Sequence, residues 1–386
     1  MGRRVRRLLY LSCDPGIPVL GHKGASVHVR ELASALCPLG VDVAIASPRI
    51  EPAGDALDAP VRLLRLPRVS PNASEPELRV ALEMQRVEVL EAARSFAADA
   101  IYERYSLLGD AGIEAAAELG IPHVLEVNAP LREEARRFRT LSHPDLAAEI
   151  EQRVFRGTGR ILVVSQALGR WLEQEGVESE RIEVVPNAVA PSRFGPRRPR
   201  GNDEFVLGFC GSLKPWHGVE LLLEACSTAF SQEPTLRLEV VGSGPLEQLL
   251  HSAGLPPHRL RALGSLPHTD AIERLRYWDV GLAPYLPAED FYFSPLKVVE
   301  YMAAGLCTVA SDIGELPTLL AGRRGVVVPA GDDRQLASVL VELARDRDRA
   351  ADLGRRARAY VLDAHTWEGN ARIVLDSCQR SQELAA

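Results

Sequence analysis

Short β-rich runs alternate with amphipathic helical segments along almost the whole chain, and this pattern constrains the fold more than any other feature of the sequence. Apolar runs such as LLYLS (8–12), VDVAIAS (41–47) and ILVVS (161–165) are typical of buried strands. Between them, segments such as VHVRELASAL (27–36) place apolar residues at helical spacing. Strands that alternate with helices form parallel sheets covered by helices. We therefore predict an α/β protein.

The chain divides into two halves that open in the same manner. Its 386 residues exceed what one ordinary hydrophobic core accommodates. The strand, loop and helix at the start are matched by a second set around the loop GSLKPWHG (211–218). Residues 186–204 lie between the halves and are rich in proline, glycine and polar side chains, which is typical of a linker. We predict an N-terminal Rossmann-like domain over 1–190 and a C-terminal one over 202–364.

Composition excludes several classes of protein. Hydrophobic residues make up 46% and charged residues 25%, the balance of a globular chain, and the formal charge of −7 argues against a nucleic-acid partner. The six cysteines form no C-x-x-C pair, which indicates a reducing compartment. The basic start is followed by an apolar run that breaks at Ser12 and Asp14, too early for a signal peptide. No apolar stretch approaches the roughly 18 residues of a membrane span, so we expect a cytoplasmic protein.

The stretch FYFSPLKVVEYMAAG (291–305) carries the most chemistry. Ser294 followed by Pro295 predicts a helix start, and Gly305 predicts its end. A helix N-terminus presents unpaired amides and partial positive charge, to which Lys297 adds a full charge. The sequence therefore predicts an anion site at this helix start.

Glu300 lies three residues after Lys297 and so projects from nearly the same helix face. Its carboxylate is suited to accept hydrogen bonds from sugar hydroxyls beside a bound phosphate. The alternative is an ordinary ion pair between Lys297 and Glu300 on a helix that only packs against a sheet. These residues alone leave both interpretations open.

Glycine-containing loops follow predicted strands, where doubly wound domains bind ligands. In GSLKPWHG, Lys214 and His217 are candidates to face a diphosphate, and the alternative is a solvated turn with Trp216 packed beneath it. GSGP (242–245) permits close approach of a ligand but also suits a tight turn. The matching loop of the first half, GHKGASVH (21–28), has the same two interpretations around Gly24.

Five segments follow one another along the chain: KGASVHVRELASAL, VVPNAVAPSRF, GSLKPWHG, VVGSGP and SPLKVVEYMAAG. Together and in this order, they resemble retaining glycosyltransferase family four, whose members have the GT-B fold. The resemblance spans nearly the whole chain and implies two parallel sheets facing each other across a cleft, with a C-terminal helix (365–386) that crosses back onto the first domain. It also implies that Glu300 holds the ribose hydroxyls, while further donor contacts come from Gly24, Ser212, His217, Gly242, Gly264, Tyr292, Phe293, Ser294, Pro295 and Leu296.

Three departures from the family pattern matter. The family's E-x7-E pair has Tyr292 at its first position here and Glu300 at its second. The arginine and lysine that commonly clamp the diphosphate fall at Ser212 and His217, so we hypothesise that Lys214 and Lys297 supply the charge.

On the acceptor side, the family's histidine after the fifth strand corresponds to Asn128. Asn128, His28, Arg104 and Glu126 are acceptor-side candidates because each lies near the carboxyl end of a predicted strand or in its loop. For each of them, a buried structural role is the alternative.

We therefore predict a metal-independent hexosyltransferase that moves a sugar from a nucleotide diphosphate, uridine type first, to an acceptor hydroxyl with retention of configuration. Lysines and helix amides stabilise the leaving group, and Lys214, Lys297 and Glu300 are the candidate catalytic residues. We find no convincing D-x-D metal motif in a loop that follows a strand. The pair Asp332 and Asp333 instead fits a helix cap. We therefore expect neither a metal nor a cofactor.

Two alternatives remain open: a nucleotide-sugar epimerase of the same fold, and a non-catalytic nucleotide-sugar-binding protein. An oxidoreductase is disfavoured because no G-x-G-x-x-G opens either half. The expected partners are a nucleotide-sugar donor and a small-molecule, glycan or lipid-linked acceptor in polysaccharide, glycolipid or natural-product synthesis. The charged segment LREEARRFRT (131–140) offers at most a peripheral membrane contact, with a solvated face as the alternative. The oligomeric state is left open.

Overall fold

The computed structural model describes residues 4–51, 57, 59–198, 204–288 and 290–385, which form two compact units. The first unit comprises Met1–Pro186, Tyr292–Ser294 and Trp367–Ala386, and the second comprises Asn187–Phe291 and Pro295–Thr366. Residues 187–190 thus belong to the second unit, although the sequence places them in the first domain. The reason is that Val189 is buried in the second unit's core and bridges to Thr366.

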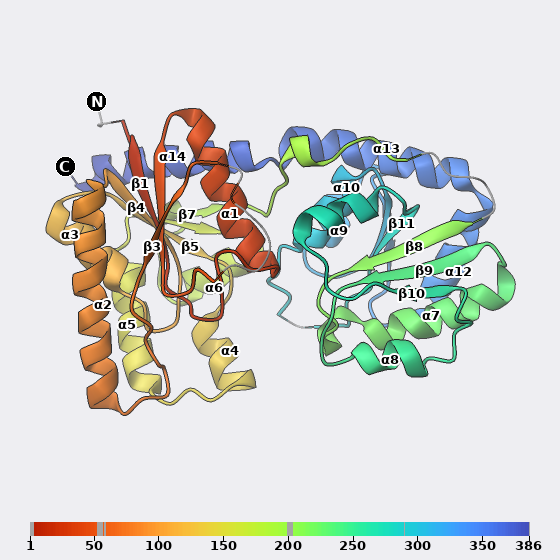
Figure 1. Ribbon diagram of the computed structural model, residues 1–386, viewed down its shortest axis with the longest axis horizontal. Coiled ribbons are helices and arrows are strands. Elements are labelled where there is room, and N and C mark those ends of the chain that lie inside the picture. The colour runs from red at the N-terminus through yellow and green to blue at the C-terminus, as the bar shows by residue number, and fades with distance from the viewer. Residues whose placement is uncertain (1–3, 52–56, 58, 199–203, 289, 386) are drawn as a thin grey trace. The chain divides into compact units, whose positions relative to one another are not determined.

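The first unit is built on a seven-stranded parallel sheet with the order β3-β2-β1-β4-β5-β6-β7 (Figure 1). The strands are β1 (Arg7–Ser12), β2 (Asp42–Ser47), β3 (Arg62–Arg65), β4 (Ala100–Arg104), β5 (His123–Val127), β6 (Arg160–Val163) and β7 (Ile182–Val184). The helices are α1 (Gly24–Leu36), α2 (Glu75–Phe96), α3 (Ala111–Leu119), α4 (Leu131–Phe138), α5 (Pro144–Gly157), α6 (Gln166–Gln174) and α14 (Trp367–Ala385). Helix α14 packs against α1, β5 and β6, so the end of the chain lies in this unit.

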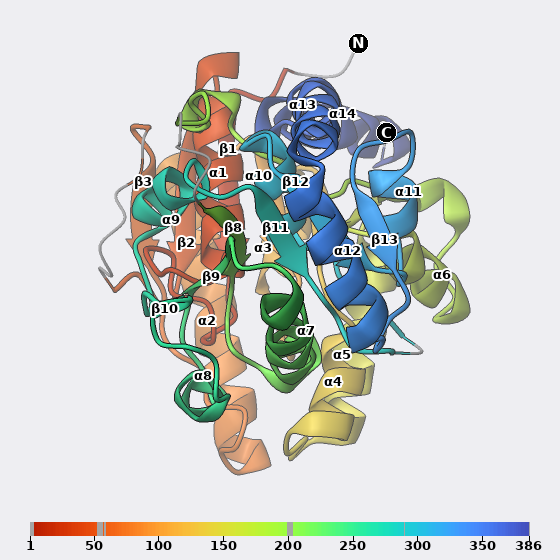
Figure 2. The same cartoon turned by 90° about the vertical axis from the view of Figure 1, so that its right-hand side faces the viewer.

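The second unit has a six-stranded parallel sheet with the order β10-β9-β8-β11-β12-β13, which Figure 2 shows from left to right. Its strands are β8 (Phe205–Cys210), β9 (Leu236–Val241), β10 (Leu260–Ala262), β11 (Val280–Ala283), β12 (Cys307–Ser311) and β13 (Val326–Val328). Its helices are α7 (Val219–Gln232), α8 (Glu247–Ser252), α9 (His268–Leu275), α10 (Leu296–Ala303), α11 (Leu316–Leu320), α12 (Asp333–Arg345) and α13 (Arg347–Ala364).

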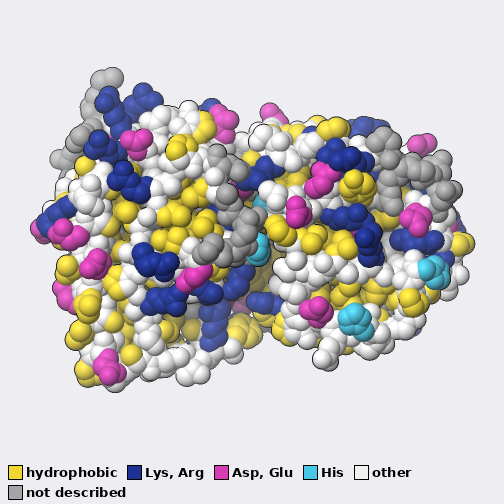
Figure 3. All heavy atoms as spheres, in the orientation of Figure 1, with side chains coloured by type: hydrophobic (Ala, Val, Ile, Leu, Met, Phe, Trp, Pro, Cys, Tyr) yellow, Lys and Arg dark blue, Asp and Glu magenta, His cyan; other side chains and the backbone are white. Residues whose placement is uncertain are grey.

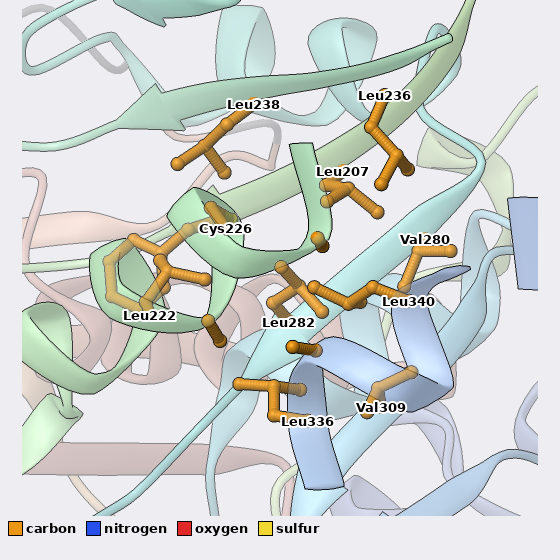
Figure 4. Close-up of a cluster of buried hydrophobic side chains, with 14 of the residues drawn as sticks. Leu207, Leu222, Cys226, Leu236, Leu238, Val280, Leu282, Val309, Leu336 and Leu340 are labelled. Atoms are coloured by element: carbon orange, nitrogen blue, oxygen red, sulfur yellow. The ribbon is translucent and has the colours of Figure 1, made fainter. Parts of the chain in front are cut away.

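Both faces of the second sheet are covered because successive side chains of a strand point to opposite faces. On β8, Leu207 joins a core with α7 and α12, whereas the preceding Val206 joins a core with α9, α10 and α13. Figure 4 shows the first of these cores, in which Leu207, Leu238 and Leu282 meet helix side chains such as Leu222 and Leu336. The predicted α/β class with parallel sheets is confirmed.

Each sheet has a topological switch point beside its first strand. β1 lies between β2 and β4, and β8 lies between β9 and β11, so the chain leaves these strands in opposite directions. Loops at such points diverge and leave room for a ligand at the carboxyl edge of the sheet. In the second unit, the loop that follows β8 is 211–218, and the described residues 284–288, 290 and 291 follow β11.

The surface of each unit mixes charges of both signs. Figure 3 shows Lys and Arg side chains together with Asp and Glu side chains on the visible face of both units. No helix in the described part of the chain is both long and apolar enough to cross a membrane.

Candidate functional site

The N-terminus of α10 lies at the carboxyl edge of the second sheet, after the loop that follows β11. The helix begins at Leu296, and Pro295 is its N-cap residue, so the predicted start at Ser294 and Pro295 is one residue too early. The reason is the backbone of Pro295, whose ψ of 107° is extended rather than helical. A proline side chain accepts no hydrogen bond, so the first-turn amides of α10 have no side-chain cap among the described residues.

Lys297 places a buried cation in this first turn. Its Nζ lies 4.2 Å from the centre of the Phe209 ring and 5.3 Å from that of Tyr285. Within the described ranges, Nζ is fully buried and has no hydrogen-bond partner. Burial lowers the pKa of Lys297 from 10.5 to about 8, against the opposing effects of Cys210 and Glu300. An unpaired buried ammonium is unfavourable, so this position suits an anion.

Glu300 does not pair with Lys297, although the two lie three residues apart. Its Oε1 lies 2.6 Å from Nε2 of His268, the first residue of α9. Both side chains of this pair are nearly buried, with exposed fractions of 12% for His268 and 10% for Glu300. The interpretation of Lys297 and Glu300 as an ordinary surface ion pair is therefore wrong.

His217 and Ser212 hold the loop after β8 in shape. Nδ1 of His217 donates a hydrogen bond to the backbone carbonyl of Ser212, and the ring centre lies 5.6 Å from that of Tyr285. Burial, reinforced by the charge of Lys297, lowers the pKa of His217 to about 3. His217 is therefore neutral near pH 7 and adds no positive charge beside Lys297.

Lys214 lies on the outer side of the same loop. Its Nζ is 4.7 Å from the centre of the Trp216 ring, and Trp216 is 47% exposed. The alternative in which Trp216 packs beneath the turn is therefore wrong. Pro215–His217 form one turn of 3-10 helix, which points successive side chains in different directions and turns His217 inward instead.

The candidate glycines differ in how closely other atoms pack against their backbones. A Cβ on Gly242 would lie 1.9 Å from the backbone oxygen of Gly211, so this glycine lets two loops pack backbone to backbone. Gly242 also donates its amide to the carbonyl of Gly264 at 2.7 Å. By contrast, a Cβ on Gly264, or on Gly24 at the start of α1, would meet no atom within 4 Å. The backbones of Gly24 and Gly264 are thus open to a ligand, whereas the space beside Gly242 is filled.

Tyr292, Phe293 and Ser294 are not grouped with Lys297 and Glu300, because all three belong to the first unit. The Tyr292 hydroxyl donates to Glu134 of α4, and its carbonyl accepts from Ser165 Oγ at 2.7 Å. Burial and the neighbouring Glu134 raise the pKa of Tyr292. The residue at the first E-x7-E position is therefore a tyrosine whose hydroxyl is bound to α4 of the first unit.

The four acceptor-side candidates meet at the carboxyl edge of the first sheet. Glu126 Oε1 lies 2.7 Å from Nε2 of His28 and 2.9 Å from Nη1 of Arg104, and it also accepts from Asn128. Burial alone raises the pKa of Glu126, but His28, Arg104 and Asn128 together lower it well below its usual range. The carboxylate is thus ionised and closely surrounded by donors. Asn128 is the only half-buried member of the four.

Sequence reasoning missed the aromatic residues around this cluster. The Tyr10 hydroxyl donates to Oε2 of Glu126 at 3.0 Å, and Trp367 packs edge-on against His28 at 4.7 Å. The sequence pattern includes Tyr10 in an apolar strand, and its hydroxyl is the only feature of the residue that indicates a polar contact. Tyr102 also lines a small cavity beside His28, Glu126 and Asn370.

Comparison with known proteins decides the family. Residues 22–193 match the family described as Glycosyltransferase Family 4, and residues 204–346 match Glycosyl transferases group 1. A phosphatidyl-myo-inositol mannosyltransferase of Mycobacterium leprae is 31% identical over 62% of this chain and 69% of its own. The chain belongs to the group 1 glycosyltransferases of family four. A D-inositol 3-phosphate glycosyltransferase of Paenarthrobacter aurescens is 26% identical over 92% of both chains.

Solved structures place the glycosyltransferase in the GT-B fold. Sucrose-phosphate synthase from Thermosynechococcus elongatus matches 99% of this chain and 100% of its own with a TM-score of 0.75 and 20% identity. Anabaena HepE, solved in complex with UDP-glucose, matches 96% of this chain and 99% of its own with a TM-score of 0.70 and 19% identity. The resemblance to family four and the GT-B fold predicted from the sequence motifs are confirmed.

The described part of the glycosyltransferase holds no cluster of three or more His, Cys, Asp or Glu residues arranged to bind a metal ion. Asp332 caps α12, and its Oδ1 accepts from the amide of Gln335 at 2.8 Å. His268 is the residue of the second unit that sequence reasoning missed. It lies four residues after Gly264, and no periodicity or motif marked it.

Proposed function

We propose that this glycosyltransferase transfers a hexose from a nucleotide diphosphate, with uridine as the first choice of base, and retains the anomeric configuration without a divalent metal. The observation that carries the proposal is the buried Nζ of Lys297, which has no hydrogen-bond partner among the described residues, at the N-terminus of α10, whose N-cap residue Pro295 provides no side-chain cap. An anion bound there receives a full charge and the partial charges of several amides.

The chemistry of this site suits a departing diphosphate. When the bond to the sugar breaks, negative charge grows on the oxygen of the leaving phosphate. Lys297 and the first-turn amides are fixed before the reaction, so they stabilise that charge without rearranging. A positive charge that is already desolvated acts more strongly than one in water.

The sugar and ribose contacts are proposed for the same edge of the second sheet. Glu300 accepts hydrogen bonds from the ribose hydroxyls, and the open backbone of Gly264 lies beside the base. Lys214 contributes to the outer rim of the phosphate site through its position on the β8 loop. In the first unit, the open backbone of Gly24 at the start of α1 is proposed as a further ligand contact. Asn128 orients the acceptor, because it is the accessible member of the Glu126 cluster.

Relatives support the choice of donor and acceptor classes. One relative is named a GDP-mannose-dependent mannosyltransferase, and HepE was solved with UDP-glucose, so guanosine is the main competitor to uridine. Two relatives are named for inositol phosphate or phosphatidylinositol acceptors. We therefore propose a polyhydroxylated acceptor, soluble or lipid-linked, in glycolipid, polysaccharide or natural-product synthesis in the cytoplasm.

A lipid-linked acceptor would be reached through a peripheral membrane contact. Phe138 at the end of α4 is 78% exposed, and the side chains of Arg136 and Arg139 are 70% and 67% exposed. Exposed arginines beside an exposed aromatic ring suit anionic lipid headgroups.

Binding and turnover test the proposal in sequence. Calorimetry with uridine, guanosine and adenosine diphosphates in the presence of a chelator identifies the base. Sugar transfer from the matching nucleotide sugars is then followed by NMR, which reports the anomeric configuration. Consumption of nucleotide sugar without any acceptor would favour an epimerase, and binding without turnover would favour a non-catalytic protein. Nucleotide affinity that is lost when magnesium is removed would refute metal independence.

A further inference from the structure

The two carboxylate oxygens of Glu300 have different surroundings. Oε1 accepts a hydrogen bond from Nε2 of His268 at 2.6 Å. Oε2 makes no hydrogen bond to any residue in the described ranges, and it is not among the buried polar atoms that lack a partner. Oε2 is therefore in contact with solvent, although Glu300 as a whole is only 8% exposed. One oxygen is held by the protein and the other is available to a ligand.

The fold explains why His268 reaches Glu300. After β10, Gly264 turns the chain with a φ of +66°, and α9 starts at His268 directly after Pro267. The turn is fixed to the residue that directly follows β9, because the Gly264 carbonyl accepts from the amide of Gly242 at 2.7 Å. This fixed turn and the start of α9 bring His268 next to α10. A carboxylate only accepts hydrogen bonds, so the ring nitrogen of His268 is the donor in this contact.

We propose that His268 is a positioning residue for recognition of the donor ribose. By holding Oε1, it fixes the rotation of the Glu300 carboxylate and presents Oε2 to the two vicinal ribose hydroxyls. This inference rests on the proposed function, in which Glu300 binds ribose. A glutamate that is already oriented in the free protein loses less side-chain entropy when the nucleotide binds.

The site consequently discriminates ribonucleotides from analogues without ribose hydroxyls. A nearly buried carboxylate oxygen that finds no donor in the bound ligand is left unsatisfied, and this loss is the usual source of strong selection for a hydroxyl. If His268 is removed, Glu300 becomes free to rotate and the selection weakens.

The test compares ligands with and without the hydroxyls on variants of the full-length protein. Affinities of uridine diphosphate and 2′,3′-dideoxyuridine diphosphate, and of the matching guanosine pair, are measured by calorimetry in a chelator. The wild-type protein is expected to prefer the ribonucleotide by at least about tenfold. His268→Ala should lose about tenfold in affinity for the ribonucleotide and little for the dideoxy analogue.

Matched variants separate positioning from a general loss of structure. His268→Gln should restore most of the affinity, because the glutamine amide nitrogen can donate from the position of Nε2. His251→Ala removes an exposed histidine of α8 and should change neither affinity. Glu300→Ala should cause the same selective loss as His268→Ala, and the double variant should be no worse than Glu300→Ala. In turnover, His268→Ala should raise the donor KM more than it lowers kcat.

The outcomes distinguish this inference from the proposed function. Equal losses for both ligands in His268→Ala, or no loss at all while the wild-type protein binds nucleotide, would overturn the role of His268 alone. A wild-type protein that binds no nucleoside diphosphate would overturn the proposed function, and this inference with it.

Discussion

Replacing Lys297 with methionine should stabilise the empty protein and weaken its binding of nucleotide diphosphate. Methionine has a similar length and keeps the contact with the rings of Phe209 and Tyr285, but it carries no charge. The buried ammonium has no hydrogen-bond partner among the described residues, so its removal leaves no acceptor unsatisfied. A residue retained for stability alone should behave in the opposite way.

The size of the effect follows from the pKa. Burial lowers the pKa of Lys297 from 10.5 to about 8. A change of that size corresponds to about 3 kcal/mol of destabilisation while the lysine is protonated in both the folded and unfolded states. Loss of the cation–π contact with Phe209 offsets about 1–2 kcal/mol. The free energy of unfolding of the variant should therefore rise by about 1–2 kcal/mol, which corresponds to about 2–8 °C in Tm.

The direction of the pKa shift determines how the stability difference between the two proteins changes with pH. The unfolded chain holds the lysine proton up to its ordinary pKa of 10.5, whereas the folded protein loses it near pH 8. Between these values the unfolded state binds more protons, so the stability of the wild-type protein rises with pH relative to the variant. The advantage of Lys297→Met should be complete below pH 8 and fade as pH increases toward 10.5.

Nucleotide affinity should change in the other direction. Loss of a hydrogen bond to a charged group weakens binding of uridine diphosphate by about 10–100-fold near pH 7. For the wild-type protein, the affinity should fall as pH rises above 8, because the ligand requires the protonated lysine. Lys297→Met should lack this part of the pH dependence.

The assay is thermal unfolding at pH 7 and at pH 10, with and without uridine diphosphate, in a chelator. Arg334→Met is the matched control, because Arg334 is an exposed cation in the first turn of α12. It experiences its own helix dipole without burial and should change Tm little and nucleotide affinity not at all. If Lys297→Met lowered Tm and left nucleotide affinity unchanged, Lys297 would be structural and the placement of the phosphate site would be refuted.

Four other outcomes are expected. Glu300→Ala should weaken nucleotide binding in a protein of unchanged circular dichroism, and full affinity in the folded variant would refute ribose binding. Calorimetry should give the same affinity for uridine diphosphate in EDTA as in magnesium. Glu126→Gln should lower the free energy of unfolding by about 3–5 kcal/mol at pH 7, measured with urea, because His28 and Arg104 lose their anion. That deficit should shrink progressively as pH falls below 4.5, because the ionised Glu126, whose pKa is lowered in the folded protein, contributes its full stabilisation only above the unfolded-state pKa of 4.5. His217→Lys should restore part of the nucleotide affinity in a Lys297→Met background, measured by calorimetry.

The sequence predicted the fold well because its periodicities are local. Alternation of strands and helices determines that the sheets are parallel, and parallel strands put their carboxyl ends at one edge. For that reason the sequence could place His28, Arg104, Glu126 and Asn128 near one another. It could not show that Glu126 accepts from Arg104 and Asn128 and lies 2.7 Å from Nε2 of His28, because these contacts depend on side-chain conformations that the strand pattern does not determine.

Errors arose where side-chain direction depends on contacts distant in the sequence. A 3-10 turn can direct any of its side chains inward, and packing against Phe209 and Tyr285 selected His217 over Trp216. The spacing of Lys297 and Glu300 allowed an ion pair, but His268 from another helix competes for the carboxylate. Such competition between partners is not encoded in any single segment.

The departures from the family pattern are connected through one pair of aromatic side chains. The rings of Phe209 and Tyr285 lie beside both His217 and Lys297, so both side chains share the same apolar surroundings. A lysine at 217 in addition to Lys297 would place two desolvated cations close together, which is unfavourable without a bound anion. A neutral histidine at 217 removes that repulsion and still holds the loop through the carbonyl of Ser212. We therefore propose that the neutral residues at 212 and 217 and the buried Lys297 belong together, because one buried cation at the proposed phosphate site avoids the repulsion between two.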